Sequence, residues 1–383
     1  MRVLHATPSY APAYRLGGPV RSLEGLLPAL QRLGLSVRVV TTDAHGDERL
    51  EVPRAWQERT GVPVLYLKRW AKPDLTPRYF VEVLREARRA DVVHVTGIFC
   101  VPTILALWAA RSVGRPVVLS PRGALEAGSL QNGPAARKRR WLETFRSLFE
   151  GVRVFHVTSD KEAASVARIF GPRTSIAVVP NGTDLPDDAP SMPSLRPSIV
   201  ALGRIHPVKG YDRLLEACAL LAERGMDFEV RIAGPVGDPA YARRLESMIQ
   251  ELGLSGRAAL VGEVLGEDKT RFLREARVLV LPSHDTENFG NVVIEALACR
   301  TPVVASRHAP WEELELHGCG RWVDNEPAAL ATAIAAYLEN AEVARAAGGR
   351  GRRLVEDVYS WECVARGMRE VYAQTLDEWS KRG

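Results

Sequence analysis

The sequence predicts an α/β fold made of two Rossmann-like lobes, and three patterns lead to that prediction. Short apolar runs alternate with amphipathic helical stretches in the first half of the chain. A segment rich in proline and aspartate follows, and then the same alternation returns. Alternating strands and helices favour parallel βαβ units with helices on both faces of a sheet. Because ligands of such folds bind at the carboxyl ends of the strands, we expect the site in a cleft between the lobes.

The first half of the chain contains six short apolar runs that we predict as strands. Helical patterns over residues 20–33 and 103–112 lie between some of these runs, as a βαβ series requires. We therefore assign residues 1–180 to an N-terminal lobe. Its predicted strands are Arg2–Ala6, Val37–Thr41, Val92–Val95, Pro116–Leu119, Val154–Val157 and Ile176–Val179.

A linker is predicted over residues 181–197, because this segment is crowded with Pro, Asp and Ser. Residues 198–364 repeat the alternation and form the predicted C-terminal lobe. A long amphipathic helix closes the chain from about residue 360. The predicted strands of the second lobe are Ser198–Leu202, Phe228–Ala233, Ala258–Val261, Val278–Leu281 and Pro302–Ala305.

Length and composition indicate a globular protein of two domains. The chain has 383 residues, of which 46% are hydrophobic and 25% charged, so disordered and fibrous classes are excluded. The longest apolar run, Ile98–Ala110, contains Pro102 and is too short for a membrane span. The first residues enter a strand pattern without the apolar core of a signal peptide, and we therefore expect a cytoplasmic protein.

The spacing of the cysteines and the net charge limit the kinds of metal site and binding partner that we expect. The five cysteines form no C-x-x-C pair, so no zinc site or disulfide framework is predicted. A net charge of +5 and a pI of about 9.0 favour anionic partners such as nucleotide phosphates or anionic lipids. We expect no nucleic-acid partner, because aromatic residues are not interleaved with the basic run in a stacking pattern.

The segment from Val278 to Ser306 is the most informative for function. A buried strand ends before Pro282, a polar loop follows, and a helix begins near Asn291. The start of a helix presents unpaired backbone N–H groups at the positive end of its dipole, which favours a phosphate group. Gly290 permits a close approach of the backbone at this point. The segment therefore predicts a phosphate site.

Two glutamates, Glu287 and Glu295, flank this turn in an E-x7-E pattern. Glu295 is the only charge in the apolar helix VVIEALAC, and a carboxylate there needs partners. Alternatively, the helix dipole alone favours a glutamate near this terminus. Glu287 by itself is an ordinary loop carboxylate. Together the two side chains would reach one cleft. There one carboxylate would accept hydrogen bonds from the hydroxyls of a sugar, and the other from the hydroxyls of a ribose.

Basic and glycine-rich loops follow the first strand of each predicted lobe. Arg204 and Lys209 lie in LGRIHPVKG between a strand and a helix, where cations would clamp a diphosphate and neutralise charge that develops on it. The alternative is a solvated basic loop. Gly17 and Gly18 precede a helix, so their amides would face an anion, although most Gly-Gly-Pro runs are plain turns.

These residues resemble glycosyltransferase family 4, the retaining group with the GT-B fold, over nearly the whole chain. The matching motifs are the N-terminal GGP loop, DVVHVTG, LSPRG, VPNGTD, LGRIHPVKG, E-NFGNVVI-E and the closing YSWE. The APWEEL and CGRWVDN runs are similar to a subgroup that builds cell-surface polysaccharides. The resemblance implies that the closing helix, about residues 365–383, returns to the first lobe.

The resemblance also implies roles for the residues around the predicted phosphate site. Glu287 would contact hydroxyls of the donor sugar, Glu295 the ribose, and Val264 the base through its backbone. The groups that would hold the diphosphate are Arg204, Lys209, the backbone amides of Phe289, Gly290 and Asn291, and Gly17 and Gly18 from the opposite lobe.

The implied reaction moves a hexosyl or related sugar from a UDP- or GDP-sugar to a saccharide or lipid-linked acceptor. The anomeric configuration is kept, and the departing phosphate takes the acceptor's proton. No D-x-D sequence occurs, so neither a metal nor another cofactor is expected. Many relatives have a histidine beside the donor sugar where this chain has Arg122. Arginine is no base and would bind an anionic group or orient the sugar; alternatively it caps a strand.

His94 and His5 also lie near strand ends that would face the cleft. His94 is a candidate for contact with the sugar or the acceptor, whereas for His5 we favour a satisfied core histidine. Residues 137–149 join a basic block to aromatic residues at helical spacing, a pattern that can rest on anionic lipid. The same pattern describes a helix packed on its own domain. A lipid-linked acceptor would place the enzyme peripherally at the inner face of the membrane.

Two other classes of protein fit a twin-lobed frame. A nucleotide-sugar epimerase would convert the donor without an acceptor. A two-lobed solute-binding protein would lack catalysis altogether. The phosphate-type constellation favours the transferase over both.

Overall fold

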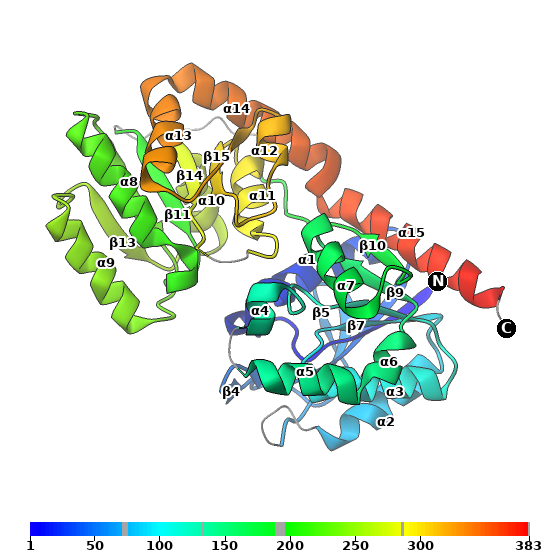
Figure 1. Cartoon of the computed structure of the whole chain (residues 1–383). Helices are drawn as coiled ribbons and strands as arrows, with labels where there is room; N and C mark the ends of the chain where they lie inside the picture. Colours follow the sequence, from blue (N-terminus) through cyan, green and yellow to red (C-terminus); the bar gives the residue numbers. More distant parts are fainter. Residues whose placement is uncertain (71–75, 132–133, 188–195, 285–286, 382–383) are drawn as a thin grey trace. The chain divides into compact units, whose positions relative to one another are not determined.

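The computed structural model describes residues 1–70, 76–131, 134–187, 196–284 and 287–381 (Figure 1). The chain forms two compact units. Unit 1 contains Met1–Gly182 together with Trp361–Gly383, and unit 2 contains Thr183–Ser360. In the part of the chain that is described, no helix is both long and apolar enough to cross a bilayer.

Unit 1 is built on an eight-stranded sheet in the order β10-β9-β8-β7-β1-β2-β6-β5. All neighbouring strands are parallel except the edge strand β5, which is antiparallel to β6. A short antiparallel pair, β3 and β4, lies outside this sheet. The strands are β1 Arg2–Ala6, β2 Ser36–Thr42, β3 Ala44–His45, β4 Glu48–Arg49, β5 Gln57–Arg59, β6 Val62–Leu67, β7 Val92–Thr96, β8 Val117–Ser120, β9 Val154–Val157 and β10 Ile176–Val178.

Helices cover both faces of this sheet. Apolar residues of α1 and α15 form one buried cluster with the sheet, and those of α2, α3, α6 and α7 form another. The helical segments are η1 Tyr14–Leu16, α1 Gly18–Arg32, α2 Pro77–Ala87, α3 Val101–Ser112, α4 Ala127–Gln131, α5 Ala135–Thr144, α6 Arg146–Glu150, α7 Asp160–Phe170 and α15 Trp361–Ser380.

The C-terminal helix α15 belongs to unit 1 and packs against α1. Its first residue, Trp361, lies between two glycines. A Cβ atom on Gly25 would fall 2.1 Å from the Trp361 ring, and one on Gly182 would fall 2.3 Å from it. Both positions therefore require glycine, because the indole occupies the space of a side chain. The helix begins at Trp361, next to the predicted start at about residue 360.

Unit 2 has a six-stranded, entirely parallel sheet in the order β13-β12-β11-β14-β15-β16. Buried clusters again lie on both faces. The strands are β11 Ser198–Leu202, β12 Glu229–Ala233, β13 Ala258–Gly262, β14 Val278–Leu281, β15 Val303–Ser306 and β16 Gly320–Val323. The helical segments are η2 Pro207–Lys209, α8 Tyr211–Glu223, α9 Pro239–Glu251, α10 Gly266–Arg274, α11 Asn291–Ala298, α12 Glu313–Leu316, α13 Pro327–Glu339, α14 Ala341–Leu354 and the π-helical turn η3 Val355–Tyr359.

Two predicted segments differ from the structure. The linker assigned to residues 181–197 lies partly outside the described residues, and Thr183 already pairs with Ser360 inside unit 2. Residues 137–149 do not form one helix, because α5 ends at Thr144 and α6 begins at Arg146. Their apolar side chains contact the core of unit 1: Trp141, Leu142, Phe145, Leu148 and the fully buried Phe149.

Candidate functional site

In unit 1 the loops that follow β1, β2, β7 and β8 surround a hollow of about 600 Å³. These loops lie at the carboxyl ends of parallel strands, the edge where open α/β sheets bind ligands. Arg122 lines the hollow and has a left-handed backbone, with φ of +56°. Its Nη1 donates a hydrogen bond to Asn181 Oδ1 at 2.8 Å. A left-handed conformation at a non-glycine residue costs about 1–3 kcal/mol and is concentrated at functional sites.

Gly17 and Gly18 are found where the sequence predicts them, at the start of α1. Gly17 has a φ of +86°, which favours glycine, and nothing lies within 4 Å of the position that a Cβ atom would take. Gly18 is the first residue of the helix. The first N–H groups of a helix have no partner within it, so this terminus is open to an anion.

His94 does not lie where a sugar could reach it. It is fully buried, and its Nδ1 and Nε2 bond Tyr372 Oη at 2.6 Å and Ser120 Oγ at 2.7 Å. Both ring nitrogens are therefore engaged, and the predicted contact with sugar or acceptor is replaced by a structural role. His5 is buried beside it, with its ring centroid 4.7 Å away. The sequence could not show that a tyrosine of α15 would occupy this space.

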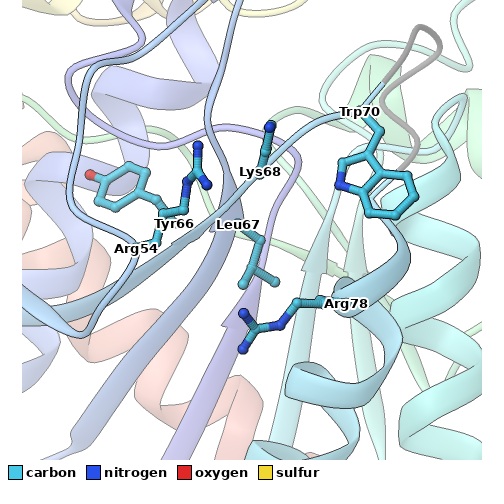
Figure 2. Close-up of a pocket in the computed structure, with 6 residues that line it drawn as sticks. All are labelled: Arg54, Tyr66, Leu67, Lys68, Trp70 and Arg78. Atoms are coloured by element: carbon cyan, nitrogen blue, oxygen red, sulfur yellow. The ribbon is translucent and has the colours of Figure 1, made fainter.

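A second, smaller hollow of about 130 Å³ lies at the carboxyl end of β6 (Figure 2). Three basic side chains line it, together with the exposed indole of Trp70. Arg54 and Lys68 make no hydrogen bond or ion pair with any described residue, whereas Arg78 pairs with Glu82 at 2.9 Å. Sequence reasoning did not identify this hollow, because its lining residues come from three separate segments.

In unit 2 the loop between β14 and α11 brings Glu287 to Lys209. Glu287 Oε2 lies 2.5 Å from Lys209 Nζ and accepts a further hydrogen bond from Ser283 Oγ at 3.3 Å. Both charged side chains are about four-fifths buried, with exposed fractions of 17% and 22%. The carboxylate that the sequence presents as an ordinary loop residue is thus held in a defined position.

Gly210 explains why these two loops meet. It has a φ of +66°, and a Cβ atom there would lie 1.9 Å from the carbonyl oxygen of Pro282. Only glycine allows the loop after β11 to approach the end of β14 so closely. The residue preceding Gly210 is Lys209, so this contact places the ammonium group beside Glu287.

Glu295 also has a lysine partner that sequence reasoning missed. Its Oε1 lies 2.9 Å from Lys269 Nζ, which comes from α10, and both side chains keep exposed fractions between 20% and 24%. The carboxylate is therefore paired and still accessible. One signal was available in the sequence, since the chain has only seven lysines and two of them pair with the two glutamates.

The start of α11 is closely supported. Gly290 adopts a left-handed conformation with φ of +79°, and a Cβ atom there would lie 3.0 Å from Leu281. Phe289 is buried, its carbonyl accepts a hydrogen bond from the Trp311 indole, and the two rings are 5.1 Å apart. Asn291 is the first residue of the helix. These contacts support the backbone that is predicted to bind phosphate.

Arg204 and Val264 lie at the same edge of the sheet as the loop before α11. Arg204 follows β11, and its aliphatic stem lies over Gly237, where a Cβ atom would be 2.5 Å from Arg204 Cγ and Cδ. Its guanidinium is exposed and makes no hydrogen bond or ion pair with the described residues. Val264, after β13, is partly buried. Both positions are compatible with their predicted roles.

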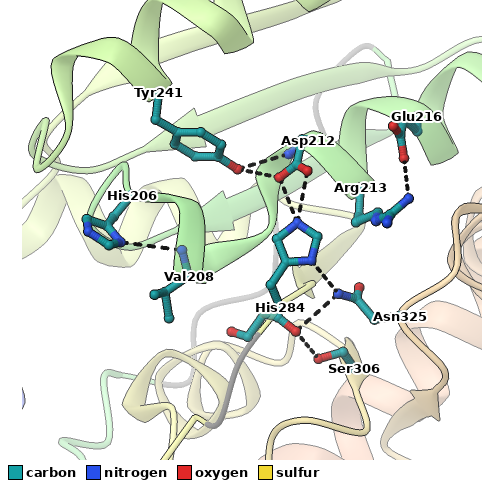
Figure 3. Close-up of polar contacts among 10 residues, drawn as sticks. His206, Val208, Asp212, Arg213, Glu216, Tyr241, His284, Ser306 and Asn325 are labelled. Carbon is teal, nitrogen blue, oxygen red and sulfur yellow. Dashed lines mark hydrogen bonds and ion pairs between the residues drawn. The ribbon is translucent and has the colours of Figure 1, made fainter. Parts of the chain in front are cut away.

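A polar network fixes the beginning of the same loop (Figure 3). His284 Nε2 lies 2.9 Å from Asp212 Oδ2, and Tyr241 Oη donates to Asp212 Oδ1 at 2.6 Å. Asn325 Nδ2 donates to His284 Nδ1 at 3.3 Å, which leaves Nε2 as the donor to the carboxylate. Burial raises the pKa of Asp212, but the hydrogen bonds from Tyr241 and His284 outweigh it and lower the pKa overall. The network was not predicted, because its members are far apart in sequence.

Two family models match the chain, one for each unit. The model described as "Glycosyl transferase 4-like domain" matches residues 17–182, and the one described as "Glycosyl transferases group 1" matches residues 189–354. Together they cover most of the two units, including Arg122, Lys209, Glu287 and Glu295 but not His5 or Tyr372.

Relatives and solved structures agree with these matches. A D-inositol 3-phosphate glycosyltransferase of Xylanimonas cellulosilytica is 33% identical over 56% of this chain and 55% of its own length. A GDP-mannose-dependent α-(1-6)-phosphatidylinositol monomannoside mannosyltransferase of Mycolicibacterium smegmatis is 31% identical over 53% of this chain and 57% of its own length. The chain thus spans about half the length of these relatives. The Anabaena HepE protein in complex with UDP has a TM-score of 0.76 at 18% identity, covering 98% of this chain and all of that one.

Proposed function

Because the chain belongs to glycosyltransferase family 4 and has its two-unit GT-B fold, we propose that it is a retaining hexosyltransferase. It moves a hexosyl or related sugar from a UDP- or GDP-sugar to a hydroxyl of a saccharide or lipid-linked saccharide, in polysaccharide or glycan assembly. The observation that supports this best is the ion pair of Lys209 with Glu287, held beside the first turn of α11. Family membership favours a transferase over the epimerase and ligand-binding alternatives.

The proposed donor site lies at the carboxyl edge of the unit 2 sheet. The first turn of α11, formed by Phe289, Gly290 and Asn291, offers N–H groups to the diphosphate. An ammonium group has three donors, so Lys209 can bond a phosphate oxygen without leaving Glu287. Glu287 then accepts hydrogen bonds from the donor sugar. Gly17 and Gly18, at the start of α1 in unit 1, stay predicted phosphate-binding residues.

The other proposed contacts with the sugar-nucleotide are assigned from where the residues lie in unit 2. Glu295 accepts hydrogen bonds from the ribose, while Lys269 neutralises it. Val264 contacts the base through its backbone. Arg204 supplies a second cation to the diphosphate, since its guanidinium is exposed and has no partner among the described residues. The name of the Mycolicibacterium relative points to a GDP-sugar and the HepE complex to UDP, so both nucleotides enter the proposal.

The reaction needs no protein base in this proposal. The bond between the anomeric carbon and the diphosphate oxygen breaks, and the acceptor oxygen bonds the same face of that carbon. The acceptor's proton passes to the departing phosphate oxygen. Arg204 and Lys209 stabilise the negative charge that grows on the diphosphate. Glu287 and Glu295 are each paired with a lysine, so they serve as holding groups.

We place the acceptor in the 600 Å³ hollow of unit 1. Its volume lies within the range of ordinary small-molecule pockets. Arg122, at its wall, would bind an anionic group of the acceptor or orient the donor sugar. The left-handed backbone of Arg122 is consistent with a functional position.

A thermal-shift screen tests the donor class. We expect UDP or GDP, and the matching sugar nucleotide, to raise the melting temperature, because a ligand that binds only the folded state stabilises it. Glu295→Ala should weaken that nucleotide's binding about tenfold, since it loses a charge-assisted hydrogen bond.

The control for this variant is Lys269→Met, which removes the same ion pair but keeps the ribose-binding carboxylate. It should bind nucleotide nearly as well as the parent chain. If Glu295→Ala instead lowered only the melting temperature of the free protein, the carboxylate would be structural. If no nucleotide produced a shift, the transferase proposal would fail.

Activity should survive chelation, because the proposal assigns charge stabilisation to Arg204 and Lys209 and uses no metal. Transfer rates measured with and without EDTA should agree within about twofold, a difference of about 0.4 kcal/mol in the barrier. Loss of activity in EDTA that is restored by Mg²⁺ or Mn²⁺ would contradict this expectation.

A further inference from the structure

One outer face of unit 1 combines exposed arginines with exposed apolar side chains. We call it the arginine face and define it by Arg78, Val81, Arg85 and Arg88 of the α2 segment and Trp108 and Arg111 of α3. The α2 residues follow the spacing i, i+3, i+7, i+10, which places them along one side of a helix. The two helices lie side by side (Figure 1). The Phe80 and Trp108 rings meet edge to face, with their centroids 6.4 Å apart.

The charge of this face has a single sign. Between residues 76 and 115 the sequence has six arginines, no lysine and three acidic residues. Glu82 and Glu86 are buried and each binds two arginines, while Asp91 pairs with Arg2. Every fully exposed charge in this stretch is therefore a guanidinium. Such a surface attracts an anionic partner and leaves little to repel it.

Large apolar side chains project between these charges. The Trp108 side chain belongs to a residue that is 57% exposed, and Val81 is 51% exposed. Holding an indole in water is unfavourable, whereas tryptophan among arginines suits the boundary between lipid headgroups and acyl chains. Most of the other apolar residues of both helices pack into the core of unit 1.

The small basic hollow adjoins the arginine face, because Arg78 belongs to both (Figure 2). Arg54 and Lys68 approach it from the other side, and Trp70 forms an apolar wall with an exposed fraction of 64%. A phosphate group in this hollow would meet three cations, and its attached chain would meet an indole. The hollow could therefore bind one phospholipid headgroup.

We infer that the arginine face docks unit 1 on an anionic phospholipid bilayer, with Trp108 and Val81 entering the headgroup layer. The inference rests on the proposed function, with the lipid-linked saccharide as the acceptor. It places the contact elsewhere than the predicted segment 137–149, whose aromatic residues pack against the core of unit 1. Only the basic end of α5, with exposed Arg137, Arg139 and Arg140, remains available to add charge.

Co-sedimentation with vesicles tests this docking surface. We expect the parent chain to bind vesicles that contain phosphatidylglycerol, not those of phosphatidylcholine alone, and to be released by salt. The double variant Arg88→Glu/Arg111→Glu should weaken partitioning at least about 25-fold, because each lost arginine costs about fivefold. Neither arginine has an ion pair with the described residues, so folding should be retained.

The matched control is Arg243→Glu/Arg244→Glu on α9 of unit 2, which changes net charge equally at exposed positions. It should bind as the parent chain does. Trp108→Ala should weaken binding several-fold, whereas Trp379→Ala, at an exposed tryptophan of α15, should not. Equal loss in both double variants would show an effect of net charge alone and would overturn the inference.

Two further outcomes would also overturn it. One is absence of binding to phosphatidylglycerol vesicles at low salt. The other is equally tight binding to heparin or RNA with no effect of Trp108→Ala, which would indicate a general polyanion surface. The nucleotide thermal shift should be unchanged in Arg88→Glu/Arg111→Glu. A chain that fails the vesicle test but retains that shift keeps its proposed donor function, so the two failures are distinguishable.

Discussion

Replacing Lys209 by methionine should lower kcat about 100- to 1000-fold, the usual cost of removing one group that stabilises transition-state charge. The ammonium of Lys209 lies 2.5 Å from Glu287, which is in the loop that precedes the proposed diphosphate site at the start of α11. The charge that it offsets develops only as the glycosidic bond breaks, so the loss should fall mainly on kcat and less on KM.

Two companion variants separate catalysis from support of the loop. Lys209→Arg keeps the charge and should restore part of the rate. Glu287→Gln leaves the ammonium in place and should raise KM for the sugar donor more than it lowers kcat, because the proposal assigns this side chain to the sugar hydroxyls. A kcat for Lys209→Met within tenfold of the parent would contradict the assigned role. Thermal unfolding of each variant shows whether the loop stays folded.

Acidification should destabilise unit 1 sharply below pH 6.5, because three buried histidines must remain neutral in the fold. Burial lowers the pKa of His5 and of His156 to about 3, helped by the charge of Arg122, and lowers that of His94 well below its usual range. In the unfolded chain all three titrate near 6.5. Between pH 6.5 and 3 the unfolded state therefore binds more protons, and the free energy of unfolding falls as the pH falls.

The hydrogen bonds of the three histidines explain why their rings stay neutral in the folded protein. One chain of hydrogen bonds runs from His5 through Tyr372, His94 and Ser120 to His156, which donates to the carbonyl of Val179 at 3.0 Å. Each imidazole donates through Nε2, and His94 and His156 accept through Nδ1. A second proton on Nδ1 of His94 or His156 would point at a hydroxyl that already donates its hydrogen to that nitrogen. Protonation thus breaks the link between the sheet and α15.

The expected decrease in the free energy of unfolding at low pH is large. At one pH unit below 6.5 each histidine costs about 1.4 kcal/mol, and the three together about 4 kcal/mol. A domain is typically stable by only about 5–15 kcal/mol. Urea unfolding at a series of pH values measures the slope, and hydrogen exchange of α15 assigns it to unit 1.

Matched variants check the origin of that slope. His5→Asn removes one titrating group and should reduce the slope by about a third. Tyr372→Phe breaks the hydrogen-bond chain but keeps all three imidazoles, so it should lower stability while leaving the slope nearly unchanged. A parent chain with a flat stability between pH 7 and 5.5 would contradict the prediction.

Strands and helices with strong periodicity were predictable from the sequence, and several bounds agree with the structure, as at Ser198–Leu202 and Val154–Val157. Strand β6 was missed because its apolar run VPVLYL contains Pro63, which weakens a strand assignment. Trp108 lies in an apolar run that predicts burial on all sides, yet its side chain is largely exposed. Periodicity cannot show which side of an apolar helix meets solvent.

The two glutamates and Lys209 were predictable from local context, whereas their supports were not. Lys269 lies 26 positions before Glu295, and no spacing rule links them. The contact between Gly210 and Pro282 depends on two strands becoming neighbours in the sheet. Sequence patterns indicate candidate groups for binding a ligand, but the contacts that hold these groups depend on tertiary structure.

The return of α15 to unit 1 has a consequence for the order in which the chain folds during synthesis. Gly182 and Trp361 are in contact in unit 1, and Thr183 pairs with Ser360 in unit 2, so unit 2 is an insertion whose ends meet. The ribosome must make all of unit 2 before Val364, Met368 and Tyr372 can fill the core of unit 1. The later half of the chain is therefore the first to complete a domain, and the N-terminal half waits for it.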